Sequence, residues 1–226
     1  MTVLGRRAPG RTPVARRVSA VAVVVAVLVA GCGGDDEDEV TEQGDGTLEL
    51  APSTATTTPP ATASLLDALL PEPPLPGFLP ADDVLGAGPL DLDAAAAGEE
   101  DIEAERALLE ERRFVAGASR AWLGPQESVA YVATYAFASA ADAEAYLDDT
   151  STRLGARGAE RFEVPGIEGA AGFTTVEAGG TGTFAASAIT FARGDRWVLS
   201  LLGSPEAAPT VDDAIALAMA QADRLG

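Results

Sequence analysis

Alternating apolar residues predict a β-sheet in the C-terminal part of the chain. Residues 128–137, SVAYVATYAF, place bulky side chains on one side of an extended strand and small side chains on the other. Neither side is charged, so both faces of this strand are expected to be covered. Five further strands are predicted, near 118–123 and at 161–164, 171–178, 183–192 and 197–203. The last of these, WVLSLLG, is apolar on both faces and is expected inside the sheet.

Helical spacing of apolar residues marks three other segments. Residues 90–113 predict one helix or a pair broken at Gly98, with acids at the start and arginines at the end. Ser139 and Thr210 each precede an aspartate by three residues, which indicates the N-caps of two more helices. Gly155 is a candidate end for the helix that begins after Ser139.

The order of these elements, α-β-β-α-β-β-β-β-α, defines the expected fold. Hairpins dominate it, so the prediction is one α+β domain over residues 80–226, with a mainly antiparallel sheet of about six strands and helices packed on it. With FEVPGIEGAAGF (162–173) before the last hairpins, the order resembles the PsbP-like fold of many small secreted lipoproteins of high-GC bacteria. The resemblance implies a domain that binds partners or ligands, and it carries over no functional residue by motif.

An apolar run near the N-terminus predicts export. Residues 18–31, VSAVAVVVAVLVAG, follow five arginines. As a helix the run spans about 21 Å, short of a bilayer core of roughly 30 Å, which favours a signal peptide over residues 1–31 and not a membrane-spanning anchor. The ending LVAGC resembles the lipobox of bacterial lipoproteins, which implies acylation of Cys32, cleavage before it, and a lipid anchor. The alternative is a chance cysteine after an ordinary signal peptide.

The segment between Cys32 and the domain is rich in acids, threonine and proline. Residues 32–63 are predicted to form a disordered tether, because the acids of GGDDEDE repel one another and an anionic membrane. Cation capture by DDEDE is the alternative, but the run lacks the spaced ligands and glycine turn of a calcium loop. Residues 64–79 form a Pro-rich lead-in that is expected to pack on the domain. O-glycosylation of the tether stays open.

The charge of the chain restricts its partners. All 15 basic residues are arginine, against 35 acids and no histidine, for a net charge of −20. Loss of the five arginines before Cys32 would leave 10 arginines and a net charge of −25. Such a surface repels nucleic acid, and it does not bind anionic lipid by charge, so membrane attachment is expected to be covalent or hydrophobic.

The residue types exclude much of enzyme chemistry. Without histidine or lysine, Ser-His-Asp and Ser-Lys schemes have no base, and with Cys32 acylated, zinc, haem and iron–sulfur sites lose their usual ligands. EAGGTGTF (177–184) lacks the lysine and helix of a phosphate loop and reads as a hairpin. Asp91 and Asp93 could form a carboxylate pair, but they stand at a helix start, where acids ordinarily cap. We expect no catalytic activity, cofactor or metal.

Two sets of residues are candidates for binding. Four aromatic residues either line an apolar pocket or form the core of the sheet: Trp122, Tyr131, Tyr135 and Trp197. A second set is either a turn or the rim of a cleft: Pro165, Gly166 and Gly169.

Two functions follow, both for a lipoprotein on the outer face of the cytoplasmic membrane. The first is non-enzymatic binding of a protein or a cell-envelope component, which requires an exposed apolar patch of several hundred Å². The second is carriage of a small hydrophobic or lipid ligand, which requires a pocket between sheet and helix of roughly 300 Å³ or more.

Overall fold

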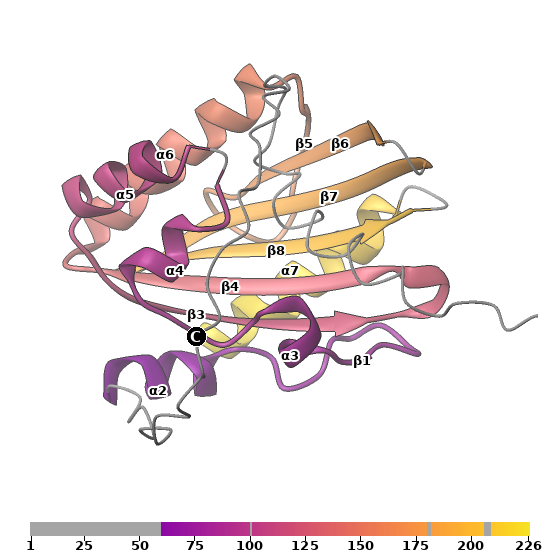
Figure 1. The fold of residues 1–226 in the computed structure, drawn as a ribbon, viewed down its shortest axis with the longest axis horizontal. Helices are drawn as coiled ribbons and strands as arrows, with labels where there is room; N and C mark the ends of the chain where they lie inside the picture. The colour runs from indigo at the N-terminus through magenta and orange to yellow at the C-terminus, as the bar shows by residue number, and fades with distance from the viewer. Residues whose placement is uncertain (1–59, 100, 180–181, 206–208) are drawn as a thin grey trace, which may run out of the picture.

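The computed structural model describes residues 60–226, except residues 100, 180–181 and 206–208. The predicted signal peptide, Cys32 and the tether up to residue 59 lie outside the described residues. The described chain forms an antiparallel sheet with helices on both of its faces, which confirms the α+β class (Figure 1). No helix in these ranges is long and apolar enough to cross a membrane.

The sheet has eight strands, and not about six. They follow the order β1-β3-β4-β8-β7-β6-β5, with β2 paired to β3 beside that path. Their bounds are β1 Leu79–Pro80, β2 Pro89–Leu90, β3 Phe114–Leu123, β4 Val129–Phe137, β5 Glu160–Phe162, β6 Ala171–Gly179, β7 Gly182–Arg193 and β8 Arg196–Ser204. The two additional strands, β1 and β2, hold two residues each and pair along β3. Strands of that length show no periodicity, so the sequence pattern could not reveal them.

Strand β8 lies inside the sheet, between β4 and β7, as its doubly apolar sequence predicts. Val198 and Leu202 face one core of the sheet, while Trp197 and Leu201 face the other side. The segment EAGGTGTF contains the paired ends of a hairpin, because β6 and β7 pair antiparallel up to Gly179 and Gly182.

Local signals located the three predicted helical segments correctly. Segment 90–113 forms the broken pair, α4 (Leu92–Ala96) and α5 (Ile102–Glu111). Helices α6 (Ala140–Ala156) and α7 (Val211–Leu225) begin at their predicted caps, whose hydroxyls accept the backbone N–H groups of Asp142 and Asp213. Helix α6 does not end at Gly155 but continues to Ala156, with Arg157 as its C-cap. The described residues also form two α-helices that no pattern predicted, α2 (Pro60–Ala68) and α3 (Asp82–Leu85), and a 3-10 helix at Pro125–Glu127.

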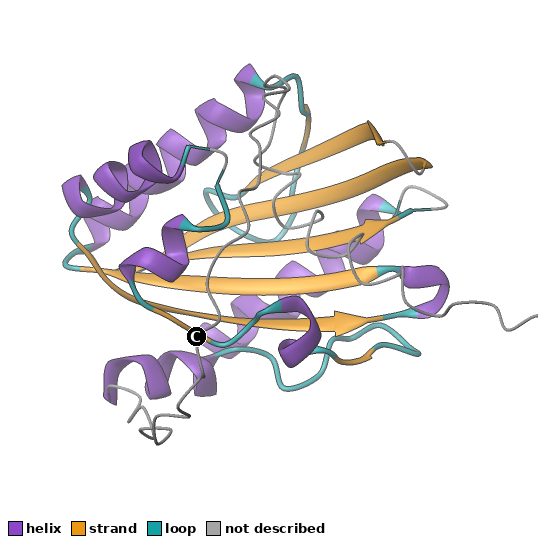
Figure 2. Cartoon of the chain, in the orientation of Figure 1, coloured by secondary structure: helices purple, strands orange, loops and turns teal. Residues whose placement is uncertain are grey.

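The two faces of the sheet carry different helices (Figure 2). Helices α7 and α2 cover one face, over a core that includes Trp122, Ile189 and Leu217. Helices α3, α4, α5 and α6 lie on the opposite face. Helix α2 begins inside the range predicted as tether, because Leu65 and Leu69 are buried in the α7 core. Packed structure on the domain therefore includes residues earlier than the predicted start at residue 80.

Candidate functional site

A cavity of about 270 Å³ opens on the sheet face that carries α4 and α6. Strand alternation builds its floor, because Tyr131 pairs with Leu201 and Ala133 with Leu199 across β4 and β8. All four side chains therefore project to the same side of the sheet. The small side chains of Ala133 and, on β7, Ala188 leave the space that the cavity occupies.

The aromatic residues at one end of the cavity form a packed wall. The ring of Trp197 lies 5.0 Å from that of Tyr135 and 5.1 Å from that of Tyr146, measured between centroids. The Trp197 Nε1–H group donates to Thr190 Oγ1 at 3.0 Å, which fixes the indole within the sheet. Packed aromatic pairs of this kind hold one another in place, so the wall is a preformed surface.

Helix α4 forms another side of the cavity. Asp91 caps this helix by accepting the N–H of Ala94 at 2.9 Å, and Asp93 pairs with Arg106. Asp91 thus has the capping role that its position predicts, and Asp93 instead joins α4 to α5 through Arg106. Ala94 and Ala95 of α4 line the cavity.

A buried carboxylate lies behind the cavity wall. The side chain of Glu105 on α5 is 1% exposed. Its Oε1 accepts a hydrogen bond of 2.5 Å from the Tyr146 hydroxyl, and its Oε2 pairs with the Arg153 guanidinium. Burial raises the pKa of the Tyr146 hydroxyl well above its usual range, and the neighbouring Tyr135 and Glu105 add to this effect. Tyr146 is therefore a hydrogen-bond donor here, and the charge of Glu105 is compensated by Arg153.

A second glutamate stands at the mouth of the cavity. The side chain of Glu99, in the connection between α4 and α5, is 22% exposed, and its Oε2 lies 3.9 Å from the Arg157 guanidinium. Burial and, after it, the charge of Glu105 raise the pKa of Glu99 to about 7, although Arg153 and Arg157 act in the opposite direction. The mouth therefore holds a carboxyl group that changes charge near neutral pH.

The predicted binding residues divide between the two faces of the sheet. Tyr131, Tyr135 and Trp197 line the cavity. Trp122 does not, because β3 directs it into the α7 core, where it is 1% exposed.

The predicted rim loop does not border this cavity either. Pro165, Gly166 and Gly169 belong to the connection between β5 and β6. A Cβ atom at Gly166 would lie 3.4 Å from the side chain of Met219 on α7, and Ile167 is buried in the α7 core. The loop thus packs on the opposite face of the sheet.

The charged residues of the site escaped the sequence prediction. One signal was available, because Glu105 stands four residues before the buried Leu109 and so lies on the apolar stripe of α5. The described residues contain no group of three or more acidic side chains placed to hold a metal ion.

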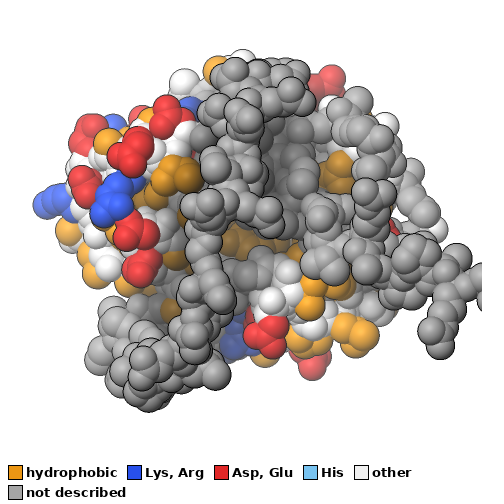
Figure 3. All heavy atoms as spheres, viewed as in Figure 1, with side chains coloured by type: hydrophobic (Ala, Val, Ile, Leu, Met, Phe, Trp, Pro, Cys, Tyr) orange, Lys and Arg blue, Asp and Glu red, His pale blue; other side chains and the backbone are white. Residues whose placement is uncertain are grey.

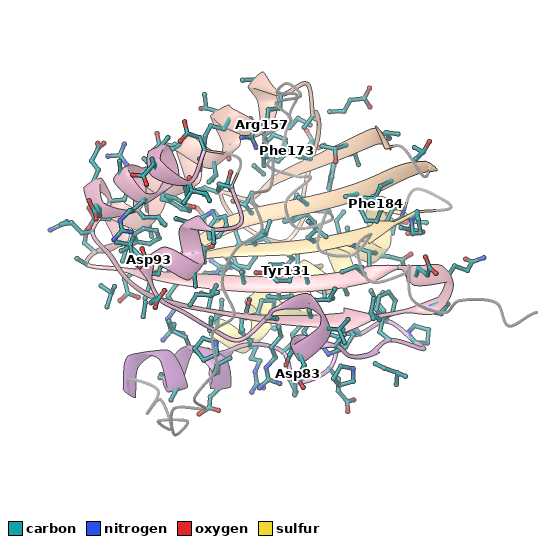
Figure 4. All side chains as sticks on the ribbon, in the orientation of Figure 1. Asp83, Asp93, Tyr131, Arg157, Phe173 and Phe184 are labelled. Carbon is teal, nitrogen blue, oxygen red and sulfur yellow. The ribbon has the colours of Figure 1, made fainter. Side chains whose placement is uncertain are left out.

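Charged side chains are most numerous over the helices on this side of the molecule. Figure 3 shows many acidic and basic side chains over the helices at the left of the view, and hydrophobic side chains toward its centre and lower right. In Figure 4, Tyr131 lies over the central strands and Arg157 lies at the C-terminal end of α6. The site thus combines an apolar floor on the sheet with a charged rim at the helices.

Comparison with known proteins reveals a likeness of fold. The sequence matches no family model and no curated protein. The structure is similar to the crystal structure of the extracellular domain of PknH from Mycobacterium tuberculosis, with a TM-score of 0.50 and 13% sequence identity. The match covers 74% of this chain and 97% of that domain. At this identity the likeness supports the α+β architecture alone, and the resemblance to the PsbP-like fold stays a prediction.

Proposed function

We propose that this protein is an exported lipoprotein whose domain binds a small ligand with an apolar body in the cavity between the sheet and α4–α6. The observation that carries the proposal is the cavity itself, whose floor consists of Tyr131, Ala133, Leu199 and Leu201. A preformed concave site with an apolar floor and a few polar groups is the usual form of a small-molecule site. The volume of about 270 Å³ lies near the lower end of the usual range of about 300–1,000 Å³, which favours a small ligand.

The other function predicted from the sequence, binding of a protein or a cell-envelope component, has weaker support. The exposed large hydrophobic residues of the described chain stand on six different elements: Leu79, Val84, Ile102, Val115, Val176 and Met219. Single apolar side chains on a surface are normal and do not by themselves make a docking site. Ligand binding therefore replaces partner binding as the leading hypothesis.

A non-catalytic role is part of this proposal. The chain has no histidine or lysine to serve as a general base, and the two arginines at the cavity are paired with glutamates. Glu99 and Glu105 are the carboxyl groups there, and Glu105 is occupied by Tyr146 and Arg153. No cofactor is required for the function that we propose.

Membrane anchoring through Cys32 rests on the lipobox-like sequence LVAGC. Two acyl chains on one cysteine hold a protein firmly to a bilayer, whereas one chain holds it marginally. Mass spectrometry of the protein extracted from membranes should show an N-terminal Cys32 that carries lipid. An intact Met1, or an unmodified thiol at Cys32, would refute the anchor.

Native mass spectrometry tests the ligand. The full-length chain with Cys32→Ser, which cannot be acylated at that position, should co-purify from its producing cells with a small molecule bound one to one. The variant Ala133→Phe, which fills the floor of the cavity, should lose that mass. The matched variant Ala107→Phe adds the same ring on an exposed position of α5 and should keep it. If Ala133→Phe and Ala107→Phe retain the bound mass equally, the ligand lies outside the cavity.

A further inference from the structure

The charged groups at the cavity differ in how well their charges are compensated. Arg153 and Glu105 form a close ion pair, and Glu105 also receives the hydroxyl of Tyr146. Glu99 and Arg157 are 3.9 Å apart at their nearest atoms, which is longer than a hydrogen bond. The cavity thus has one glutamate with close partners, Glu105, and one whose ion pair with arginine is long, Glu99.

The charge of the chain favours a cationic ligand over an anionic one. The net charge of −20 produces a field that attracts cations and repels anions. At the cavity, burial, followed by Tyr131, Glu105 and Glu99, raises the pKa of the Tyr135 hydroxyl well above its usual range, and Arg153 acts in the opposite direction. A ligand with an anionic group would have to overcome the field of the acidic chain.

We infer that the ligand is an amphipathic amine, whose protonated nitrogen pairs with the Glu99 carboxylate while its apolar body lies on Tyr131, Leu199 and Leu201. This inference rests on the proposed function and names the chemical class of its ligand. A cation at the mouth supplies the short-range compensation that Arg157 provides only at 3.9 Å. The lining of the cavity also includes tyrosine and tryptophan side chains, residue types whose π faces attract cations.

The pairing requires Glu99 in its charged form, so binding depends on pH. Glu99 is surrounded by Glu105 of α5 and by Arg153 and Arg157 at the end of α6, and the raised pKa of its carboxyl is about 7. An alkylamine keeps its proton up to a pH of about 10. The affinity for the amine should therefore rise from pH 6 to pH 8, because the carboxylate forms while the amine stays charged.

A set of three probes with the same body tests the charge preference. Isothermal titration calorimetry at pH 8 would compare 4-phenylbutylamine, 4-phenylbutanol and 4-phenylbutyrate on the full-length Cys32→Ser chain. The amine should bind about tenfold more tightly than the alcohol, which corresponds to about 1.4 kcal/mol, because a hydrogen bond between two charged groups is stronger than one between neutral groups. Glu99→Gln should remove this advantage of the amine over the alcohol, whereas the matched variant Glu103→Gln, on the exposed side of α5, should bind both probes like the parent chain.

Each outcome of this comparison decides a different point. Equal binding of amine and alcohol would overturn the inference and leave the proposed apolar cavity intact. Tightest binding of the carboxylate would also overturn it, and would assign the head group to Arg157. If none of the three probes binds, the proposed function fails and the inference fails with it.

Discussion

The hydroxyl of Tyr146 donates a hydrogen bond of 2.5 Å to the buried carboxylate of Glu105, which joins α6 to α5 beside the cavity. The second oxygen of Glu105 pairs with Arg153, so both oxygens are satisfied although the side chain is 1% exposed. A buried charge is tolerated only when it is paired and hydrogen-bonded. Glu105 therefore stabilises the packing of α5 on α6, and the wall of the cavity depends on this arrangement.

Removal of the Tyr146 hydroxyl should destabilise the fold. Tyr146→Phe keeps the ring contacts with Trp197 but leaves Oε1 of a buried carboxylate without its donor. The free energy of unfolding should fall by about 1–3 kcal/mol. Urea unfolding at neutral pH measures this change in free energy. Tyr135→Phe is the matched control, because the Tyr135 hydroxyl lies 3.4 Å from the Ala95 carbonyl and makes a weaker hydrogen bond. Equal losses of unfolding free energy in the two variants would contradict the role assigned to Glu105.

Gln221 connects α7 to the end of α2, and its replacement should weaken the attachment of α2 to the domain. Its Oε1 accepts the N–H of Leu70 at 2.9 Å, and its Nε2 donates to the Ala68 carbonyl at 3.0 Å. Gln221→Met keeps the length of the side chain but removes both bonds, each worth about 1–3 kcal/mol if its backbone partner stays buried and unsatisfied. Amide hydrogen exchange at residues 65–70 should become faster. Asp223→Met, on the exposed side of the same helix, should leave that exchange unchanged.

The contrast between α2 and the later helices explains what the sequence could predict. Ser139 and Thr210 determine their helix starts through hydrogen bonds within three residues, so a local pattern was sufficient. The end of α2 is held by Gln221, which is 151 residues away from Leu70 in the chain. No local pattern encodes a contact of that separation, and the Pro-rich composition of residues 64–79 predicted a lead-in that packs on the domain but not a helix.

The residues of the candidate site were likewise predictable only where a local sequence pattern determines their position. Strand alternation placed Tyr131 and Tyr135 on one face of β4, and these residues line the cavity. The choice of face for Trp122 depended on the register of β3 against β4, which pairs it with Ala130 and so directs it to the α7 side. Glu99 has no sequence signature, because its properties come from burial and from Glu105 and the α6 arginines.

The charge state of Glu99 should make the stability of the fold depend on pH. Burial, followed by Glu105, raises the pKa of this carboxyl from its ordinary 4.5 to about 7. Between these two values the folded chain binds more protons at Glu99 than the unfolded chain does, so this group lowers the free energy of unfolding as pH rises. The neutral acid is tolerated in the fold, whereas the carboxylate is penalised.

Glu99→Gln should remove this contribution to the pH dependence of the free energy of unfolding. Relative to the parent chain, the variant should gain stability progressively from pH 5 to pH 7 and hold a constant advantage above about pH 7.5. Urea unfolding at half-unit pH intervals measures the difference, and Glu103→Gln on the exposed side of α5 corrects for the loss of one acid from the chain. Parallel stability curves for Glu99→Gln and the parent would show that the carboxyl is not buried as the structure places it.

Filling the cavity should remove ligand binding without unfolding the protein. Ala188 is 1% exposed and lies on the cavity floor, opposite Leu201 on β8. Ala188→Leu directs its added carbons into the existing space, so the free energy of unfolding should stay within about 1.5 kcal/mol of the parent, less than the 1–3 kcal/mol typical of overpacking a filled core. Affinity for 4-phenylbutanol, measured by calorimetry, should fall below detection.

The control for this substitution lies on the other face of the same strand pair. Ala185 is 6% exposed and projects to the α7 side of β7, away from the cavity that Ala188 lines. Ala185→Leu should therefore cost stability and leave affinity for 4-phenylbutanol unchanged. If Ala188→Leu destabilised the fold as much as Ala185→Leu and still bound the alcohol, the space beside Ala188 would not be the ligand site.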